Sequence, residues 1–514
     1  MSLFRAAPAL VVLAIMVADS GRFADPDLWG HVRFGQAVLS QGHLIPHDPY
    51  SYSAPGHLWL NHEWLSEVIM AWLYSMLGVP GLKLMKLACT TATVAFLAAA
   101  EAETAAPLAV QAAVLIAAAV IIGPQLQFRP QLFTFALMSA LLALLARRNY
   151  RGSSQLWLAV PILALWANLH GGFIIGLAAL AAFSAAATLE DRITGRRWRR
   201  PAVLWLTTAL ATLATLATPY GVGTWDAVVH ALANPVTHYA INDWRPLVPA
   251  LIAQWRAGGL AVAFPLLGVI MLAASVVSVA LAPNGGDVPL IAVAGLMVAG
   301  AFAALRNLAL AIIATSVPLA HHLALALQRA PESRKRRQQT EASSVGARLG
   351  WASQLVILVL SFQVAWGTGL FSKGLDAAVS CPTGAVSFMK QHQLHGNVLG
   401  EFDWGEYLIW HLAPQSKVFI DGRYDTVYPA KIIEDYLDFA SDRPSAERVL
   451  KIYPHDLVMV RVQSPAFRLM SERRDWKLIY RDAAAALYAR SDSRTASLFD
   501  SPVTSSTAPE SSFP

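Results

Sequence analysis

Residues 130–172 read PQLFTFALMSALLALLARRNYRGSSQLWLAVPILALWANLHGG, and this stretch decides the fold class. Its first apolar run, over 130–147, is long enough to cross a bilayer, which takes about 17 to 25 residues. The run ends in Arg147, Arg148 and Arg151, a basic cluster typical of a cytoplasmic loop, and a second apolar run follows. This order of apolar span, basic loop and apolar span predicts a helical membrane protein.

Apolar runs of this kind recur along most of the chain. Of the 514 residues, 55% are hydrophobic and only 14% are charged, whereas soluble domains carry about 25% charged residues. The runs predict about eleven membrane helices, over 3–19, 81–100, 105–123, 130–147, 155–168, 171–188, 202–217, 259–282, 287–305, 307–327 and 350–371. The runs 155–168 and 171–188 are separated by Asn168, His170 and two glycines, and are either two short spans or one broken span.

The N-terminal run has two interpretations. Arg5 followed by a short apolar core is compatible with a cleaved signal peptide. No small-residue cleavage site precedes Asp25, so we favour an uncleaved first helix. The two cysteines, Cys89 and Cys381, have no CxxC spacing and indicate no disulfide framework.

The basic residues predict the orientation of the chain. With the N-terminus inside, every basic cluster falls in a cytoplasmic loop: Arg147, Arg148 and Arg151; Arg192, Arg196, Arg197, Arg199 and Arg200; and Arg329, Arg334, Lys335, Arg336 and Arg337. The net charge of +6 is therefore explained by topology, and no nucleic-acid partner is expected. The polar and aromatic segments fall on the outer side, where we expect the chemistry to take place.

The sequence divides into a membrane domain over 1–371, with an external first loop over 20–80, and an extracytoplasmic α/β domain over 372–490. In the second domain, the segments NVLGEF, KVFIDGR, LVMVRV and WKLIYRD have the pattern of strands, and WGEYLIWHLA, AKIIEDYLDFAS and PAFRLMSER that of helices. The tail 491–514 is rich in Ser, Thr and Pro and is predicted to be disordered, and 331–349 is a charged cytoplasmic linker.

The acidic motif Asp25-Pro26-Asp27 follows the first predicted helix directly. A carboxylate here could act as a general base toward an acceptor hydroxyl, or ligate a divalent cation. The structural alternative is helix capping, because Asp27 precedes LWGHVRFGQAVL, a plausible amphipathic helix. Both roles are compatible if capping fixes Asp27 and leaves Asp25 free.

The rest of the first loop contains five histidines between aromatic residues. His62-Glu63 lacks the second histidine of a metalloprotease motif, and the histidines are too scattered in sequence to define a metal site. His62 and Glu63 are nevertheless candidate substrate-binding residues. The structural alternative is an amphipathic lid on the outer leaflet, with its aromatic residues at the interface.

Three isolated arginines are expected outside, near helix ends: Arg129 in QFRPQ, Arg245 in NDWRP and Arg306 in LRN. The guanidinium fork suits a phosphate, so convergent arginines would form a seat for a lipid-linked phosphate. Snorkelling to lipid headgroups is the alternative for each. His170 in WANLHGGF is a further substrate-binding candidate, with a simple turn between two helices as the alternative.

In the C-terminal domain, Asp421-Gly422-Arg423 follows a predicted strand, and we favour a turn with an ion pair over a site. The chain has no P-loop, no GxGxxG after a strand, no GxSxG and no Cys/His metal spacing. These absences argue against an ATPase, a cytosolic redox enzyme or a serine hydrolase.

Together these motifs resemble the GT-C superfamily, the membrane glycosyltransferases that use polyprenyl-phosphate-linked sugars. More closely, DPDLWGHVRFGQAVLSQGHLIPHDPYSYS, HEWLSEV, FRPQLF, WANLHGGF and YLIWHLAPQSKVFIDGRYD resemble a poorly characterised group of bacterial membrane proteins of that type. The resemblance extends to about residue 490. It implies a multi-pass protein of the bacterial cytoplasmic membrane that transfers a sugar at the outer face to a glycan, lipid or protein acceptor.

The resemblance places the base or metal ligand on Asp25 or Asp27, without choosing between them. Superfamily members often have adjacent Asp and Glu here, whereas this chain has Pro26 between two aspartates. Arg129, with Arg245 or Arg306, would stabilise the departing lipid phosphate. A divalent cation is a possible cofactor.

Two other classes of function fit a polytopic chain. A transporter or flippase for a lipid-linked or anionic solute would place charged residues deep within the helices. A non-catalytic envelope scaffold would place its better binding surface in residues 372–490.

Overall fold

The computed structural model describes residues 23–195, 200–234, 242–259, 262–282, 286–328, 374–377, 380–506 and 512–514. The chain forms two compact units. The helical unit takes its described residues from 83–222 and 241–372, and the α/β unit takes them from 23–82, 223–240 and 373–514. The helices predicted over 3–19 and 350–371, and the linker 331–349, lie outside the described residues.

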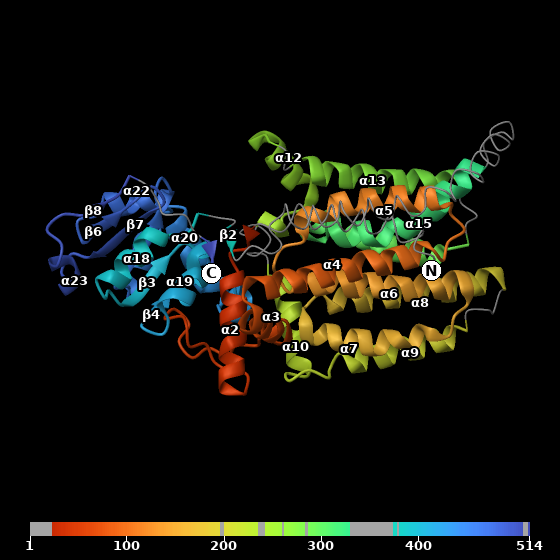
Figure 1. The fold of residues 1–514 in the computed structure, drawn as a ribbon, viewed down its shortest axis with the longest axis horizontal. Helices are drawn as coiled ribbons and strands as arrows, with labels where there is room; N and C mark the ends of the chain where they lie inside the picture. Colours follow the sequence, from red (N-terminus) through yellow and green to blue (C-terminus); the bar gives the residue numbers. More distant parts are fainter. Residues whose placement is uncertain are drawn as a thin grey trace. The chain divides into compact units, whose positions relative to one another are not determined.

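The helical unit is built from apolar helices (Figure 1). Its main helices are α4 (Val79–Glu101), α5 (Leu108–Ile122), α6 (Gln131–Arg151), α7 (Ala159–Leu169), α8 (Phe173–Thr194), α9 (Pro201–Ala214), α13 (Ala263–Leu281), α14 (Val288–Ala303) and α15 (Leu308–Gln328). Six helical segments among the described residues are long and apolar enough to span a membrane, and shorter apolar helices accompany them. The predicted multi-pass helical membrane region is therefore confirmed.

Helix α15 forms the centre of this unit. Its most apolar stretch of 18 residues is 89% buried, and the helix packs against α5, α6, α13 and α14. The runs 155–168 and 171–188 form two helices, because His170 is extended between α7 and α8. Two further helices, α10 (Val222–Ala233) and α12 (Leu247–Ala257), lie in a stretch that we expected to be an external loop.

The α/β unit is organised around a six-stranded mixed sheet in the order β4-β3-β5-β7-β6-β8. These strands are β3 (Gly396–Gly400), β4 (Ser416–Val418), β5 (Leu457–Arg461), β6 (Trp476–Arg481), β7 (Ala485–Arg490) and β8 (Val503–Thr504). The accompanying helices are α18 (Thr383–Gln391), α19 (Gly405–Leu412), α20 (Ala430–Ala440), α21 (Ala446–Ile452), α22 (Pro465–Ser471) and α23 (Arg494–Ser497). The predicted mixed α/β character of the C-terminal region is confirmed.

The first loop is part of this same unit. It forms α2 (Leu28–Gln41) and α3 (Trp64–Leu77), which pack against each other, and α2 also packs against α19. Helix α2 is buried over its N-terminal half and ends at Gly42, whose positive φ of 71° suits a residue without a Cβ. Backbone hydrogen bonds join Tyr50 and Tyr52 to Val418, so the loop extends the sheet at its β4 edge.

A small second sheet joins three distant parts of the chain. Strand β2 (Leu375–Ala377) pairs in parallel with β1 (Phe23–Ala24) and antiparallel with β9 (Ser512–Phe513). The tail 491–514, predicted to be disordered, thus contributes α23, β8 and β9 among its described residues. The Ser/Pro-rich composition gave no indication that the Phe513 ring is fully buried. This ring contacts Trp29, Tyr74 and Trp410.

Candidate functional site

The acidic motif lies at the start of α2, where its two carboxylates differ. Asp25 is buried, and its Oδ1 accepts a hydrogen bond from the backbone N–H of Asp27 at 3.0 Å. Asp27 occupies the N-cap position without a side-chain capping bond, and it is partly exposed. The expectation that Asp27 is fixed by capping and Asp25 left free is therefore reversed. Asp25 orders the turn, and Asp27 is the accessible carboxylate.

Glu406, at the start of α19, lies beside Asp27. A Cβ added to Gly422 would lie 2.6 Å from Asp27 Oδ1 and 2.7 Å from Glu406 Oε1, so both carboxyl groups flank this glycine. Glu406 Oε2 accepts the backbone N–H of Gly30 at 3.0 Å. Burial raises the pKa of Glu406 well above its ordinary value; the charges of Asp27, Asp421 and Glu67 raise it further, and only Arg423 opposes them. Burial and the neighbouring acids thus favour the neutral form of Glu406, which lies next to the partly exposed Asp27.

No pattern in the sequence connects Glu406 with the first loop. Its position in FDWGEYLIW is compatible with an ordinary first-turn helix acid. The only signal in the sequence was a pair of glycines, Gly30 and Gly422. Without a Cβ, they allow another part of the chain to approach the backbone closely. A Cβ at Gly30 would collide with the Glu406 carboxyl group.

Arg423 holds the neighbouring part of the unit together. Its guanidinium binds Asp421 in a bidentate pair, with donor–acceptor distances of 2.8 and 2.7 Å, and donates to Asp48 of the first loop at 2.7 Å. The predicted ion pair after the strand is confirmed. The guanidinium carbon also lies 5.0, 5.2 and 4.8 Å from the ring centroids of Phe34, Tyr50 and Trp59.

These contacts determine the charge of the acids around Arg423. Burial alone would raise the pKa of Asp48, but the charge of Arg423, with hydrogen bonds from Ser51 and Tyr50, lowers it below the ordinary value. Asp48 is therefore ionised at neutral pH. This contrasts with Glu406, for which burial and neighbouring acids dominate.

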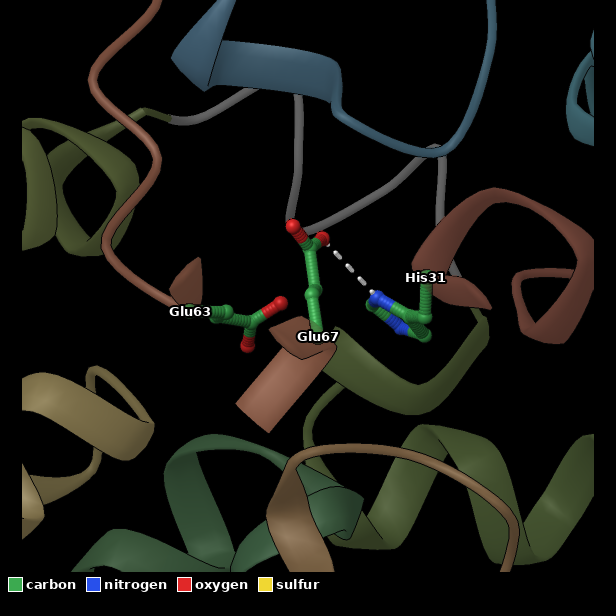
Figure 2. Close-up of side chains that lie close together, drawn as sticks. All are labelled: His31, Glu63 and Glu67. Carbon is green, nitrogen blue, oxygen red and sulfur yellow. Dashed lines mark hydrogen bonds and ion pairs between the residues drawn. The ribbon is translucent and has the colours of Figure 1, made fainter. Parts of the chain in front are cut away.

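A third group of side chains gathers between α2 and α3. His31, Glu63 and Glu67 each offer one ligand atom, and these atoms lie within 4.8 Å of one another (Figure 2). His31 Nδ1 is 3.2 Å from Glu67 Oε1. Burial alone would lower the pKa of His31, but the hydrogen bond to Glu67 and the charges of Glu63, Glu67 and Asp27 raise it overall.

Sequence spacing did not reveal this group. Glu63 and Glu67 are four residues apart at the start of α3, whereas His31 lies on another helix. The other predicted candidate, His62, has its Nε2 3.9 Å from Glu63 Oε1. His43, His47 and His57 are exposed.

In the helical unit, the segments that carry the three predicted arginines contact one another. Arg129 Nη1 is 3.8 Å from Asp243 Oδ2, and the guanidinium of Arg306 lies 4.6 Å from the Trp244 ring centroid. The backbone N–H of Leu305 donates to the carbonyl of Arg245 at 2.9 Å. QFRPQ, NDWRP and LRN therefore lie close together in the helical unit.

Two buried lysines were overlooked in the sequence. Lys83 and Lys86 lie in the first two turns of α4, and the Lys86 ammonium is 4.4 Å from the ring centroid of Phe128, the neighbour of Arg129. Despite these two lysines, the hydropathy of the run is still that of a membrane span, so the lysines did not stand out.

His170 belongs to the turn between α7 and α8. The Trp166 indole donates to Thr134 Oγ1 at 2.8 Å, and the Thr134 hydroxyl in turn lies 2.8 Å from His170 Nδ1. The N–H of Gly172 donates to the same nitrogen at 3.0 Å. This geometry favours the structural alternative of a simple turn, with the imidazole ordering it.

The comparisons with known proteins bear on the fold. No protein-family model and no curated protein matches the sequence. Among solved structures, the archaeal oligosaccharyltransferase AglB from Archaeoglobus fulgidus, in complex with an inhibitory peptide and a dolichol-phosphate, is similar with a TM-score of 0.55 and 11% identity, over 88% of this chain and 69% of that chain. Its apo form is similar with a TM-score of 0.51 and 12% identity, over 96% and 74% of the two chains.

A third solved structure, ArnT from Cupriavidus metallidurans bound to undecaprenyl phosphate, gives a TM-score of 0.47 and 13% identity over 95% of this chain and 97% of that chain. The structural similarity to AglB shows that this chain has a GT-C-like fold. At these identities the similarity shows the fold and leaves donor and acceptor open.

Proposed function

We propose that this protein is an integral membrane glycosyltransferase that transfers a sugar from a polyprenyl-phosphate-linked donor to an acceptor at the outer face of the cytoplasmic membrane. The observation that carries the proposal is the position and exposure of the Asp27 carboxylate. On a GT-C-like fold, at the start of the first loop helix, this partly exposed carboxylate lies beside the buried Glu406, whose pKa is raised by burial.

Asp27 would act as the general base. The acceptor hydroxyl gives its proton to Asp27 as its oxygen attacks the anomeric carbon of the donor. The bond from that carbon to the phosphate oxygen breaks, and the polyprenyl phosphate leaves with the bonding electrons. General-base assistance of this kind contributes about 10² to 10⁴ in rate.

Arg129, Arg245, Arg306 and Lys86 would bind the lipid phosphate. Guanidinium groups bind phosphate in a bidentate manner, and an ammonium adds a compact charge. Together they would offset the negative charge that develops on the leaving group. Asp243 and Trp244 support the proposal, because they orient Arg129 and Arg306.

The test is a transfer assay on the purified full-length protein in lipid nanodiscs. The donors are undecaprenyl-phosphate-linked hexoses and pentoses with a labelled sugar, and added envelope membranes supply acceptors. Asp27→Asn should lower the transfer rate at least about 100-fold. The matched control Asp492→Asn changes an exposed aspartate of the same unit and should leave the rate unchanged. Wild-type activity in Asp27→Asn, or no transfer from any donor, would count against the proposal.

Binding of undecaprenyl phosphate, measured by native mass spectrometry, tests the basic cluster separately. Lys86→Met and Arg306→Met should each weaken binding, because each removes one cation from the proposed phosphate site. Arg151→Met is the matched control in the same unit, since Arg151 is exposed and paired with Glu103. Equal binding by all three variants would remove these residues from the proposed site.

A further inference from the structure

We infer that His31, Glu63 and Glu67 form a binding site for one divalent transition-metal cation in the α/β unit. The three ligand atoms, one imidazole nitrogen and two carboxylate oxygens, lie within 4.8 Å of one another. Two ligands of one ion at bond lengths near 2.1 Å lie at most about 4.2 Å apart. Small side-chain rotations therefore suffice to bring all three onto one ion.

The side chains converge from two helices. Figure 2 shows the side chains of Glu63 and His31 on either side of that of Glu67. His31 projects from the second turn of α2, Glu63 occupies the N-cap position of α3, and Glu67 lies in the first turn of α3. A Cβ at Gly35 would collide with the backbone carbonyl of Glu67, so the two helices are closely packed at this point. The packing of α2 on α3 thus fixes His31 and Glu67, and Glu63 lies in the turn that directly precedes α3.

Asn61 holds the Glu67 carboxylate and the Glu63 backbone from outside the ligand set. Its Nδ2 donates to Glu67 Oε2 at 2.5 Å, and its Oδ1 accepts the backbone N–H of Glu63 at 3.2 Å. This leaves Glu67 Oε1 as the oxygen directed at His31. Outer hydrogen bonds of this kind orient ligands in metal sites, and their loss typically costs about 10- to 100-fold in affinity.

The donor set indicates the type of cation. Mg²⁺ and Ca²⁺ prefer oxygen ligands alone, whereas an imidazole combined with carboxylates suits Zn²⁺ or Mn²⁺. Two carboxylates against one imidazole also leave an excess of negative charge, to which the nearby Asp27 adds. A dication would offset this charge, whereas an ion pair between His31 and Glu67 alone would not.

The site is distinct from the acidic motif and does not depend on the proposed function. Asp27 precedes His31 by one helical turn, and the His31 N–H donates to the Asp27 carbonyl at 3.0 Å. A cation bound to His31 would therefore stabilise the first turn of α2, where Asp27 lies. Its role toward Asp27 is positional.

The experiment measures binding without any sugar substrate. Chelator-treated full-length protein is titrated with Mn²⁺, bound ion is counted from the loss of the free Mn²⁺ electron paramagnetic resonance signal, and Zn²⁺ is then added as competitor. We expect one Mn²⁺ per chain, displaced by Zn²⁺. Glu63→Gln is the main variant, because Glu63 is the least buried of the three, and it should weaken binding at least about tenfold.

Glu447→Gln is the matched control, since Glu447 is an exposed acid of the same unit. Because His31→Gln and Glu67→Gln alter a buried pair, their folding is checked by thermal unfolding. Added Mn²⁺ should raise the Tm of the wild type and of Glu447→Gln, and raise that of Glu63→Gln much less. Absence of bound Mn²⁺ and Zn²⁺, or binding by Glu63→Gln equal to that of the control, would overturn the site and leave an ion pair only.

Discussion

Glu406 accepts a hydrogen bond from the backbone of Gly30 at 3.0 Å, although 376 positions separate them in the chain. The bond joins α2, which follows the acidic motif, to α19 in the C-terminal part of the α/β unit. Because the acceptor is a buried carboxyl group, the contact also sets the electrostatic surroundings of Asp27.

The ionisation of Glu406 should make stability depend on pH. Its raised pKa means that the unfolded chain loses this proton near pH 4.5, whereas the folded chain keeps it to higher pH. The free energy of unfolding should therefore fall as pH rises from about 4.5 through the folded-state pKa. Glu406→Gln keeps a hydrogen-bond acceptor for Gly30 and removes the titration. Chemical denaturation from pH 4.5 to 8 should show a gain in stability of this variant over wild type that grows with pH; a constant difference would contradict the assignment.

Gly422 should tolerate no side chain. Alanine there would place a Cβ 2.6 Å from Asp27 Oδ1 and 2.7 Å from Glu406 Oε1, so the carboxyl groups must separate. Under the proposed function, Gly422→Ala should lower the turnover number at least about tenfold, because misplacement of a catalytic group by about 1 Å can cost 10²-fold. Gly374→Ala is the control, since no atom of the described residues lies within 4 Å of its added Cβ. Equal turnover by the two variants would argue against a role for this part of the site.

Arg423 should be the most sensitive charged residue of the α/β unit. Removing it in Arg423→Ala leaves Asp48 and Asp421 buried without their counter-charge, which typically costs about 3 to 5 kcal/mol. Arg423→Lys keeps the charge but loses the bidentate geometry, so its loss should be intermediate. Arg468→Ala, which breaks an exposed pair with Asp442, should cost less than about 1 kcal/mol. Denaturant unfolding of the intact protein measures all three, and similar losses for Arg423→Ala and Arg468→Ala would contradict the prediction.

His455 should weaken the α/β unit in mild acid. It is buried between the Tyr52 hydroxyl, 2.6 Å from Nδ1, and the Val449 carbonyl, 3.0 Å from Nε2. In the neutral ring Nε2–H donates to Val449 and Nδ1 accepts from Tyr52, and burial lowers the pKa from 6.5 to about 4. The unfolded chain then binds a proton first as pH falls, so stability is lost between about pH 6.5 and 4.

The measurement for His455 is thermal unfolding of wild type, His455→Gln and Tyr52→Phe across this pH range. His455→Gln removes the titrating ring and should reduce the loss in acid, whereas Tyr52→Phe leaves the ring buried, which is the main cause of its lowered pKa, and should retain the loss. His57→Gln is the control, since His57 is exposed. A pH profile of His57→Gln that is flatter than that of wild type would show that the loss of stability in acid does not come from His455 alone.

The fold class could be predicted because each element carries its own local signal. Long apolar runs such as Gln131–Arg151 and short apolar strands such as Leu457–Arg461 need no information from elsewhere in the chain. The joining of the first loop to the C-terminal region could not be predicted. It depends on single contacts over long separations, such as Tyr52 with His455, 403 positions apart. No periodic pattern in the sequence indicates these long-range contacts.

The candidate site was predictable only in part, for the same reason. Asp27 and the arginines stood out because they are isolated charges beside apolar runs. Glu406 and Lys86 did not, since one resembles an ordinary helix acid and the other lies within an apolar helix. His31 and Glu67 needed the packing of α2 on α3 to bring them together.

The three-stranded sheet formed by β1, β2 and β9 fixes an order of events in biosynthesis. Strand β1 precedes the residues of the helical unit in the sequence, whereas β2 and β9 follow them. The first loop is therefore synthesised long before its partners, and the α/β unit can be completed only once β9 has been made. A nascent chain halted before residue 373 holds α2 and α3 without the sheet they pack against. Residues 373–514 produced alone would expose the surface that binds them.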